Sequence, residues 1–158
     1  MEVVDEERPE DVCDLPQPPD FFQEIELDRS GSQLCWALTF KCPPRCKWAA
    51  EAPHRWKLEA VPVGVRVESL NGSVIDGSLQ IHLRSESGAS HNGVGLLRVS
   101  LFLCTQETGV CTSRTLYIQL NIQLTDKKVN SNIEKVISLP PLTWSDSHVR
   151  SFEYMAFT

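Results

Sequence analysis

Two long runs of alternating apolar residues, separated by one turn, constrain the fold of this chain more than any other feature. Residues 96–104, LLRVSLFLC, carry an apolar side chain at every second position, and residues 116–124, LYIQLNIQL, repeat the pattern. A period of two is typical of a strand that buries one face. The dipeptide Thr108-Gly109 favours a turn between the runs. The sequence therefore predicts a long antiparallel hairpin.

Shorter strand signals precede this hairpin. Alternating or short apolar runs occur at residues 34–40, 56–60, 63–67 and 79–83, with turn dipeptides such as Asn71-Gly72 between them. No stretch of comparable quality has helical spacing. About six short strands joined by turns are typical of an antiparallel β-sandwich of immunoglobulin-like type, so we predict an all-β fold. Trp36 and Trp56 fall on predicted buried faces and are expected in the core.

The acidic residues are concentrated at the N-terminus. Residues 1–28 hold eleven acids against the single base Arg8, whereas the other residues hold ten acids and fourteen bases. We expect residues 1–24, which are also rich in proline, to form a flexible leader. Residues 25–125 are the predicted sandwich domain. Residues 126–158 have only a weak period, and no structure is assigned to them from the sequence.

Composition and short motifs argue against several classes of protein. No apolar run approaches the roughly 20 residues of a membrane-spanning helix, and the N-terminus lacks the basic and apolar regions of a secretory signal. We therefore expect a cytoplasmic protein without a membrane partner. The bases of the body are scattered, with Lys127-Lys128 as the one adjacent pair, which argues against nucleic-acid binding. No hydrolase triad or phosphate loop stands out, so we expect no cofactor.

The cysteines Cys104 and Cys111 flank the predicted turn and form the one plausible chemical centre. Cross-strand neighbours can meet the Cα separation of about 4.4–6.8 Å that a disulfide requires. Closing so short a loop would stabilise the fold by only about 2–3 kcal/mol. Thiol–disulfide exchange needs one ionised thiol, for which Arg114 is a candidate neighbour and Glu107 a candidate opponent. A redox pair, a static staple and two inert thiols all remain open on the spacing alone.

A structural zinc site is a further alternative. Cys42-Pro-Pro-Arg-Cys46 has a Cys-x3-Cys spacing that could join the hairpin cysteines in a four-thiolate site. The prolines between these two cysteines restrict how the thiolates could converge, and no second tight knuckle is present. Cys35 and Cys13 are expected to be incidental thiols.

Three stretches in this order resemble the β-stranded C-terminal domain of NHL repeat-containing protein 2, which in that family follows a thioredoxin-like domain and an NHL propeller. They are the strand at residues 34–40, then Pro43-Pro44 with Glu51-Ala52-Pro53 and Trp56, and finally the hairpin at residues 96–124 with its Cys-x6-Cys. The resemblance covers residues 25–125. More distantly, the chain resembles the immunoglobulin-like N-terminal domain of the bacterial transmembrane disulfide reductase, which exchanges electrons through a similarly spaced cysteine pair.

The resemblance implies a non-catalytic module that docks against a thioredoxin-like domain or an NHL propeller. It also implies that Cys104 and Cys111 are an exchange pair and that Trp36, Pro53 and Trp56 are structural. Two departures limit this inference, because the other two domains are absent from the sequence and the segment after Thr125 leaves the family pattern. We therefore expect a fragment, an isoform or a stand-alone relative. The competing hypothesis is a purely structural interaction domain with passive cysteines.

Overall fold

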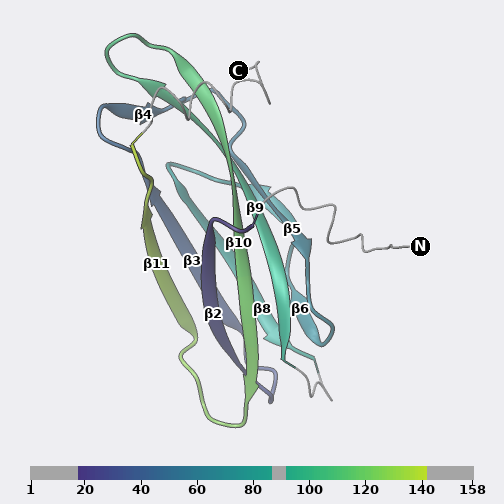
Figure 1. The fold of residues 1–158 in the computed structure, drawn as a ribbon. Coiled ribbons are helices and arrows are strands. Elements are labelled where there is room, and N and C mark those ends of the chain that lie inside the picture. The colour runs from purple at the N-terminus through teal and green to yellow at the C-terminus, as the bar shows by residue number, and fades with distance from the viewer. Residues whose placement is uncertain (1–17, 87–91, 142–158) are drawn as a thin grey trace, which may run out of the picture.

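The computed structural model describes residues 18–86 and 92–141, and every regular element in these ranges is a β-strand (Figure 1). The first sheet has the order β2 (Phe21–Asp28), β10 (Cys111–Thr125), β9 (Gly93–Thr105), β5 (Arg55–Ala60) and β7 (Asn71–Ser73), and β4 (Cys46–Trp48) also pairs with β9. The second sheet has the order β11 (Asn132–Ser138), β3 (Leu34–Lys41), β8 (Ser78–Ser85) and β6 (Val65–Val67). The prediction of an all-β sandwich is confirmed.

The predicted hairpin is the centre of the first sheet. Strands β9 and β10 pair antiparallel from Cys104 opposite Cys111 to Gly93 opposite Ile122. Their inward side chains are buried between the sheets, and this set includes Leu97, Val99, Leu101, Leu103, Leu116, Ile118, Leu120 and Ile122. Trp36 of β3 and Trp56 of β5 join the same cluster, as the alternation predicted. Burial of these apolar surfaces supplies the main driving force for the fold.

Two strands lie outside the elements that the sequence indicated. Strand β2 begins at Phe21, before the expected domain boundary at residue 25, and pairs parallel with β10. Strand β11 lies in the segment that had no assigned structure and pairs parallel with β3. Because parallel strands are not joined by a short turn, no local sequence signal predicts their pairing. The short strands β4 and β7 also raise the number of strands above the expected six or so.

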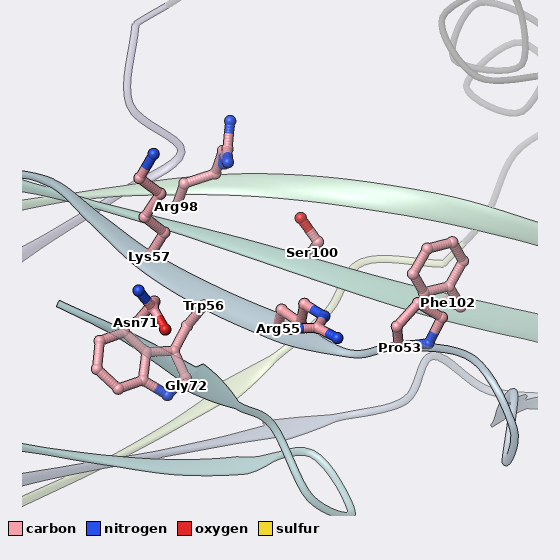
Figure 2. Close-up of a pocket in the computed structure, with 9 residues that line it drawn as sticks. All are labelled: Pro53, Arg55, Trp56, Lys57, Asn71, Gly72, Arg98, Ser100 and Phe102. Atoms are coloured by element: carbon pink, nitrogen blue, oxygen red, sulfur yellow. The ribbon is translucent and has the colours of Figure 1, made fainter. Parts of the chain in front are cut away.

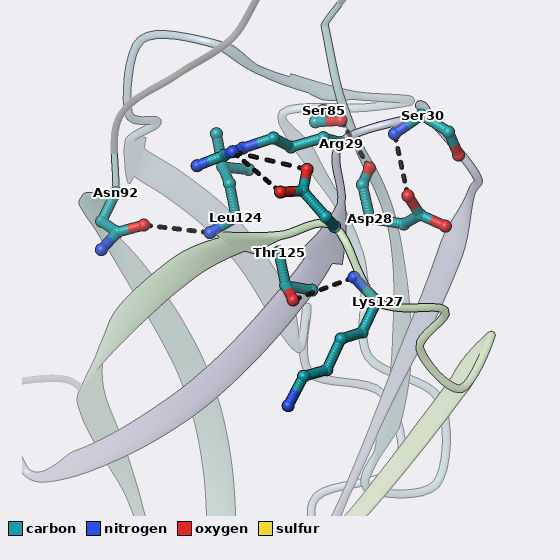
Figure 3. Close-up of polar contacts among 9 residues, drawn as sticks. Asp28, Arg29, Ser30, Ser85, Asn92, Leu124, Thr125 and Lys127 are labelled. Atoms are coloured by element: carbon teal, nitrogen blue, oxygen red, sulfur yellow. Dashed lines mark hydrogen bonds and ion pairs between the residues drawn. The ribbon is translucent and has the colours of Figure 1, made fainter.

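Polar contacts close the end of the sandwich that lies opposite the tip of the β9–β10 hairpin (Figure 3). The Ser85 hydroxyl in the second sheet donates a 2.7 Å hydrogen bond to the carbonyl of Asp28 in the first. The Arg29 guanidinium contacts the Asp126 carboxylate at 3.4 Å, and the amide of Leu124 donates to the Asn92 side chain at 3.0 Å. The contacts of Asp28 and Arg29 tie the end of β2 to both sheets, whereas that of Leu124 joins β10 to the residue before β9.

Within residues 18–86 and 92–141, no helix has the length and hydropathy needed to cross a bilayer.

Candidate redox site at the hairpin tip

Cys104 and Cys111 form a disulfide at the tip of the β9–β10 hairpin, with an S–S distance of 1.95 Å and a Cα–Cα distance of 3.9 Å. The two residues are register partners, and the adjacent Thr105 amide donates to the Val110 carbonyl at 2.9 Å. The cysteines therefore occupy a non-hydrogen-bonded pair, where cross-strand side chains approach most closely, and their Cα separation is shorter than the expected range of about 4.4–6.8 Å. The period of the two strands brings the pair into contact, as the sequence predicted.

The turn that joins the two cysteines is held by its own hydrogen bonds. The Gly109 amide donates to the Thr105 carbonyl at 2.9 Å, and the Thr105 and Thr108 hydroxyls are hydrogen-bonded to each other. Gly109 has a φ of 71°, and a Cβ at this position would meet nothing within 4 Å. Glycine is favoured there because of the left-handed backbone conformation. The turn thus presents the disulfide on a defined loop.

The two cysteine residues differ in their exposure to solvent. Cys104 is 6% exposed, whereas Cys111 lies among the exposed residues. An incoming thiolate must approach the S–S bond along its axis, and it can reach only a sulfur that is open to solvent. Of the two cysteines, Cys111 is therefore the one more open to an incoming thiolate.

The charged residue beside the disulfide differs from the one that the sequence suggested. Arg114 is the register partner of Leu101, so it shares the inward face of the sheet, and its guanidinium donates to the Pro140 carbonyl at 3.2 Å. Arg114, a candidate neighbour on the sequence alone, thus lies on the opposite face of β10 from Cys111. Instead, the exposed Lys47 of β4 lies directly opposite Cys104 on the outward face. This lysine places a positive charge on the same face of the sheet as the disulfide.

The remaining described thiols near this end are Cys42 and Cys46. They flank a turn in which the Cys46 amide donates to the Pro43 carbonyl at 3.2 Å and Arg45 adopts a φ of 65°. Burial, together with the nearby Cys46, raises the pKa of Cys42 to about 11. Burial also raises the pKa of Cys46, although the Arg114 guanidinium opposes this shift. Both thiols are therefore harder to ionise than an ordinary cysteine, which makes them weaker nucleophiles.

The predicted alternative of a four-thiolate zinc site has no counterpart in the described residues. Cys46 is the register partner of Thr105, so its side chain lies on the face of the sheet opposite to that of Cys104. Cys104 and Cys111 are bonded to each other, and no group of three or more candidate ligands converges within residues 18–86 and 92–141. Cys35 is half-buried on β3, and Cys13 lies outside the described residues.

The three structural residues named from the sequence have different environments. Trp36 is fully buried, and Trp56 is 6% exposed and packs against Gly72 on β7. Pro53 is exposed and lines a groove on the outward face of the first sheet. His54, which no pattern singled out, links the β4–β5 loop to β9, because its ring nitrogens bond the Ala49 carbonyl at 2.7 Å and the Phe102 amide at 3.2 Å.

The fold and the site together define an all-β sandwich module with a solvent-accessible disulfide at a hairpin tip. No family model and no curated protein matches the chain. Among solved structures, it has a weak similarity to the CupB2 chaperone of Pseudomonas aeruginosa, with a TM-score of 0.29 and 7% identity over 63% of this chain. The match spans 53% of the chaperone's length. At this level of similarity, the chaperone carries no argument about function.

Proposed function

We propose that this chain is a non-catalytic, cytoplasmic β-sandwich module that exchanges the Cys104–Cys111 disulfide with a thioredoxin-like partner. The observation that carries the proposal is the unequal exposure of the two cysteine residues, because it leaves Cys111 more open to attack than Cys104. The resemblance to the C-terminal domain of NHL repeat-containing protein 2 supports the choice of partner. An NHL propeller is the second surface against which such a module would dock.

The exchange proceeds in two displacements. A thiolate of the partner attacks Sγ of Cys111, which forms a mixed disulfide and expels Cys104 as a thiolate beside the Lys47 ammonium. The second thiolate of the partner then attacks the partner's own sulfur in the mixed disulfide and releases Cys111. The partner leaves as a disulfide, and its two protons and two electrons end on Cys104 and Cys111. The reverse sequence reoxidises the module.

The disulfide contributes little to the stability of the fold. The loop closed by the disulfide is short, so the bond contributes only about 2.5 kcal/mol in the chain-entropy model. The core of the sandwich lies between the sheets and does not include either sulfur. Reduction therefore leaves the module folded, as a reversible exchange requires.

Titration in a series of reduced and oxidised glutathione, followed by alkylation and mass analysis, tests the exchange. Cys104 and Cys111 should change together from bonded to alkylated as the poise becomes reducing, whereas Cys35 serves as a reference thiol that is alkylated throughout. Complete alkylation of both hairpin cysteines at every glutathione ratio, including the most oxidising one, would exclude exchange. A disulfide that stays intact at every ratio of reduced to oxidised glutathione would also exclude exchange.

An interaction domain with passive cysteines is the second candidate, and the edges of the sheets favour it. Strand β11 forms one edge of the second sheet and exposes Val136, which is 56% exposed. An unpaired edge of this kind can accept a strand from another protein. Under this hypothesis, replacing both hairpin cysteines by serine leaves partner binding intact, whereas under the exchange hypothesis the mixed disulfide with the partner is lost.

A further inference from the structure

The outward face of the first sheet carries a groove with an excess of positive charge. Its volume is about 530 Å³, and its walls include Arg55 and Lys57 of β5 and Arg98 and Phe102 of β9. Figure 2 shows the Lys57 and Arg98 side chains rising together from neighbouring strands. We call this feature the basic groove.

The positive charge of the basic groove is only partly neutralised. Lys57 and Arg98 are register partners, so two like charges lie directly opposite each other across β5 and β9. Such a pair is unfavourable in a sheet unless an anion lies nearby. Glu59 contacts the Arg98 guanidinium at 3.1 Å, but no ion pair to Arg55 or Lys57 occurs within the described part of the chain. The groove is therefore suited to bind carboxylates.

Asp20, just before β2, lies in the same row of cross-strand neighbours as Lys57 and Arg98. The Asp20 amide donates to the Tyr117 carbonyl at 2.8 Å, and the Tyr117 amide donates back to the Asp20 carboxylate at 2.8 Å. Tyr117 is the register partner of Arg98, which in turn faces Lys57. Three strand spacings therefore separate Asp20 from Lys57, a distance of about 14 Å.

The residues before this point have the complementary charge. Residues 1–17 contain seven acids and the single base Arg8. A chain of this length can reach up to about 56 Å when extended, so the span to the basic groove is easily covered. Attachment to the same sheet also gives these carboxylates a high effective concentration at the groove.

We propose that the acidic segment of residues 2–14 docks in the basic groove of its own chain, where its carboxylates bind Arg55, Lys57 and Arg98. This contact is independent of the hairpin disulfide. It neutralises the like-charged pair at the centre of the sheet face. An anionic partner that used this face would have to displace the segment.

Zero-length cross-linking of the full chain with a carbodiimide tests the proposal, because the reagent joins a carboxylate to a lysine amine only when the two are in contact. Lys57 is the lysine of the groove, and Lys47, on the same face at the hairpin tip, is the reference. We expect links from residues 2–14 to Lys57 to exceed those to Lys47 by about fivefold at low salt. In 1 M salt the excess should disappear, because the screening length falls to about 3 Å.

A charge-matched pair of variants separates groove binding from general attraction. Arg55→Gln with Arg98→Gln removes two cations from the groove and should reduce the links to Lys57 about threefold or more. Arg66→Gln with Arg84→Gln makes the same change in charge on the second sheet. Each double variant also breaks one ion pair, because Arg66 contacts Glu86 at 3.2 Å in the second sheet just as Arg98 contacts Glu59 in the first. This control should leave the links to Lys57 unchanged.

Three results would overturn the proposal. Links spread evenly over the lysines would show that the segment has no preferred site. An equal loss of Lys57 links in both double variants would show that net charge, and not the groove, attracts the segment. Links that appear only in a covalent dimer and increase with protein concentration would assign the segment to the groove of a second copy.

Discussion

Replacing both Cys104 and Cys111 by serine should lower the free energy of unfolding by a modest amount and leave the fold intact. The two residues are separated by seven positions, so the disulfide closes a loop of about eight residues. The chain-entropy relation gives a loss of about 0.6 kcal/mol from its constant and about 1.8 kcal/mol from the loop length at 25 °C. We therefore expect a loss of about 2.5 kcal/mol, because the hydrophobic core between the sheets is untouched.

Urea unfolding followed by tryptophan fluorescence measures this loss, since Trp36 and Trp56 lie in the core. With a slope of about 2.5 kcal/mol per M, the midpoint should fall by about 1 M. The chemically reduced wild-type protein is the matched control and should unfold at nearly the same midpoint as the double variant. Global unfolding on reduction alone would refute the reasoning, because it would make the bond a structural staple whose loss the module does not survive.

Further predictions concern three single residues. Gly72→Ala should destabilise the fold by about 1–3 kcal/mol in the same unfolding assay, because the added Cβ would lie 2.6 Å from Nε1 of Trp56, and no loss would refute this packing. The Cys42 thiol should react with iodoacetamide far more slowly at pH 8 than an ordinary thiol, because its pKa is raised from 9.0 to about 11. The native state holds this proton more tightly than the unfolded chain, so stability should decline as pH rises from 9.0 to about 11, and a rise in stability over that window would contradict the shift. Lys47→Gln should slow reduction of the disulfide by a dithiol about two- to fivefold. The control variant Lys135→Gln, on β11 of the second sheet, should have no effect.

Local alternation in the sequence predicted the strands that bury one face. The runs that became β3, β5, β8, β9 and β10 each place apolar side chains at every second position. The structure buries those positions except Ala60 of β5, which is exposed and follows a register shift after Leu58. Strand β11 buries only Ile137 fully, so its period was too weak to recognise. Strand β2 alternates apolar residues with acids, and its first residues, 21–24, fall in the predicted leader, whereas residues 25–28 fall in the predicted domain. Short strands such as β4 have too few residues for any period.

The candidate site was partly predictable for the same reason. The contact between Cys104 and Cys111 follows from the turn and the period of two adjacent strands, which are local features of the sequence. The position of Lys47 depends on the pairing of β4 with β9, which joins residues far apart in the chain. Arg114 is close to the pair in sequence, but the alternation of the strand turns it to the inward face. The positions of charged residues around the cysteine pair therefore could not be predicted from the sequence and required the three-dimensional structure.

Trapping of the mixed disulfide tests the central claim most directly. A thioredoxin whose second active-site cysteine is replaced by serine cannot complete the exchange, so the intermediate accumulates and its linked peptides can be mapped by mass spectrometry. The unequal exposure of the two cysteine residues predicts a single adduct at Cys111, with Cys104 released as a free thiol. An adduct at Cys104 or Cys46 would contradict the account. So would the absence of any adduct when the reduced thioredoxin variant is mixed with the disulfide-bonded module.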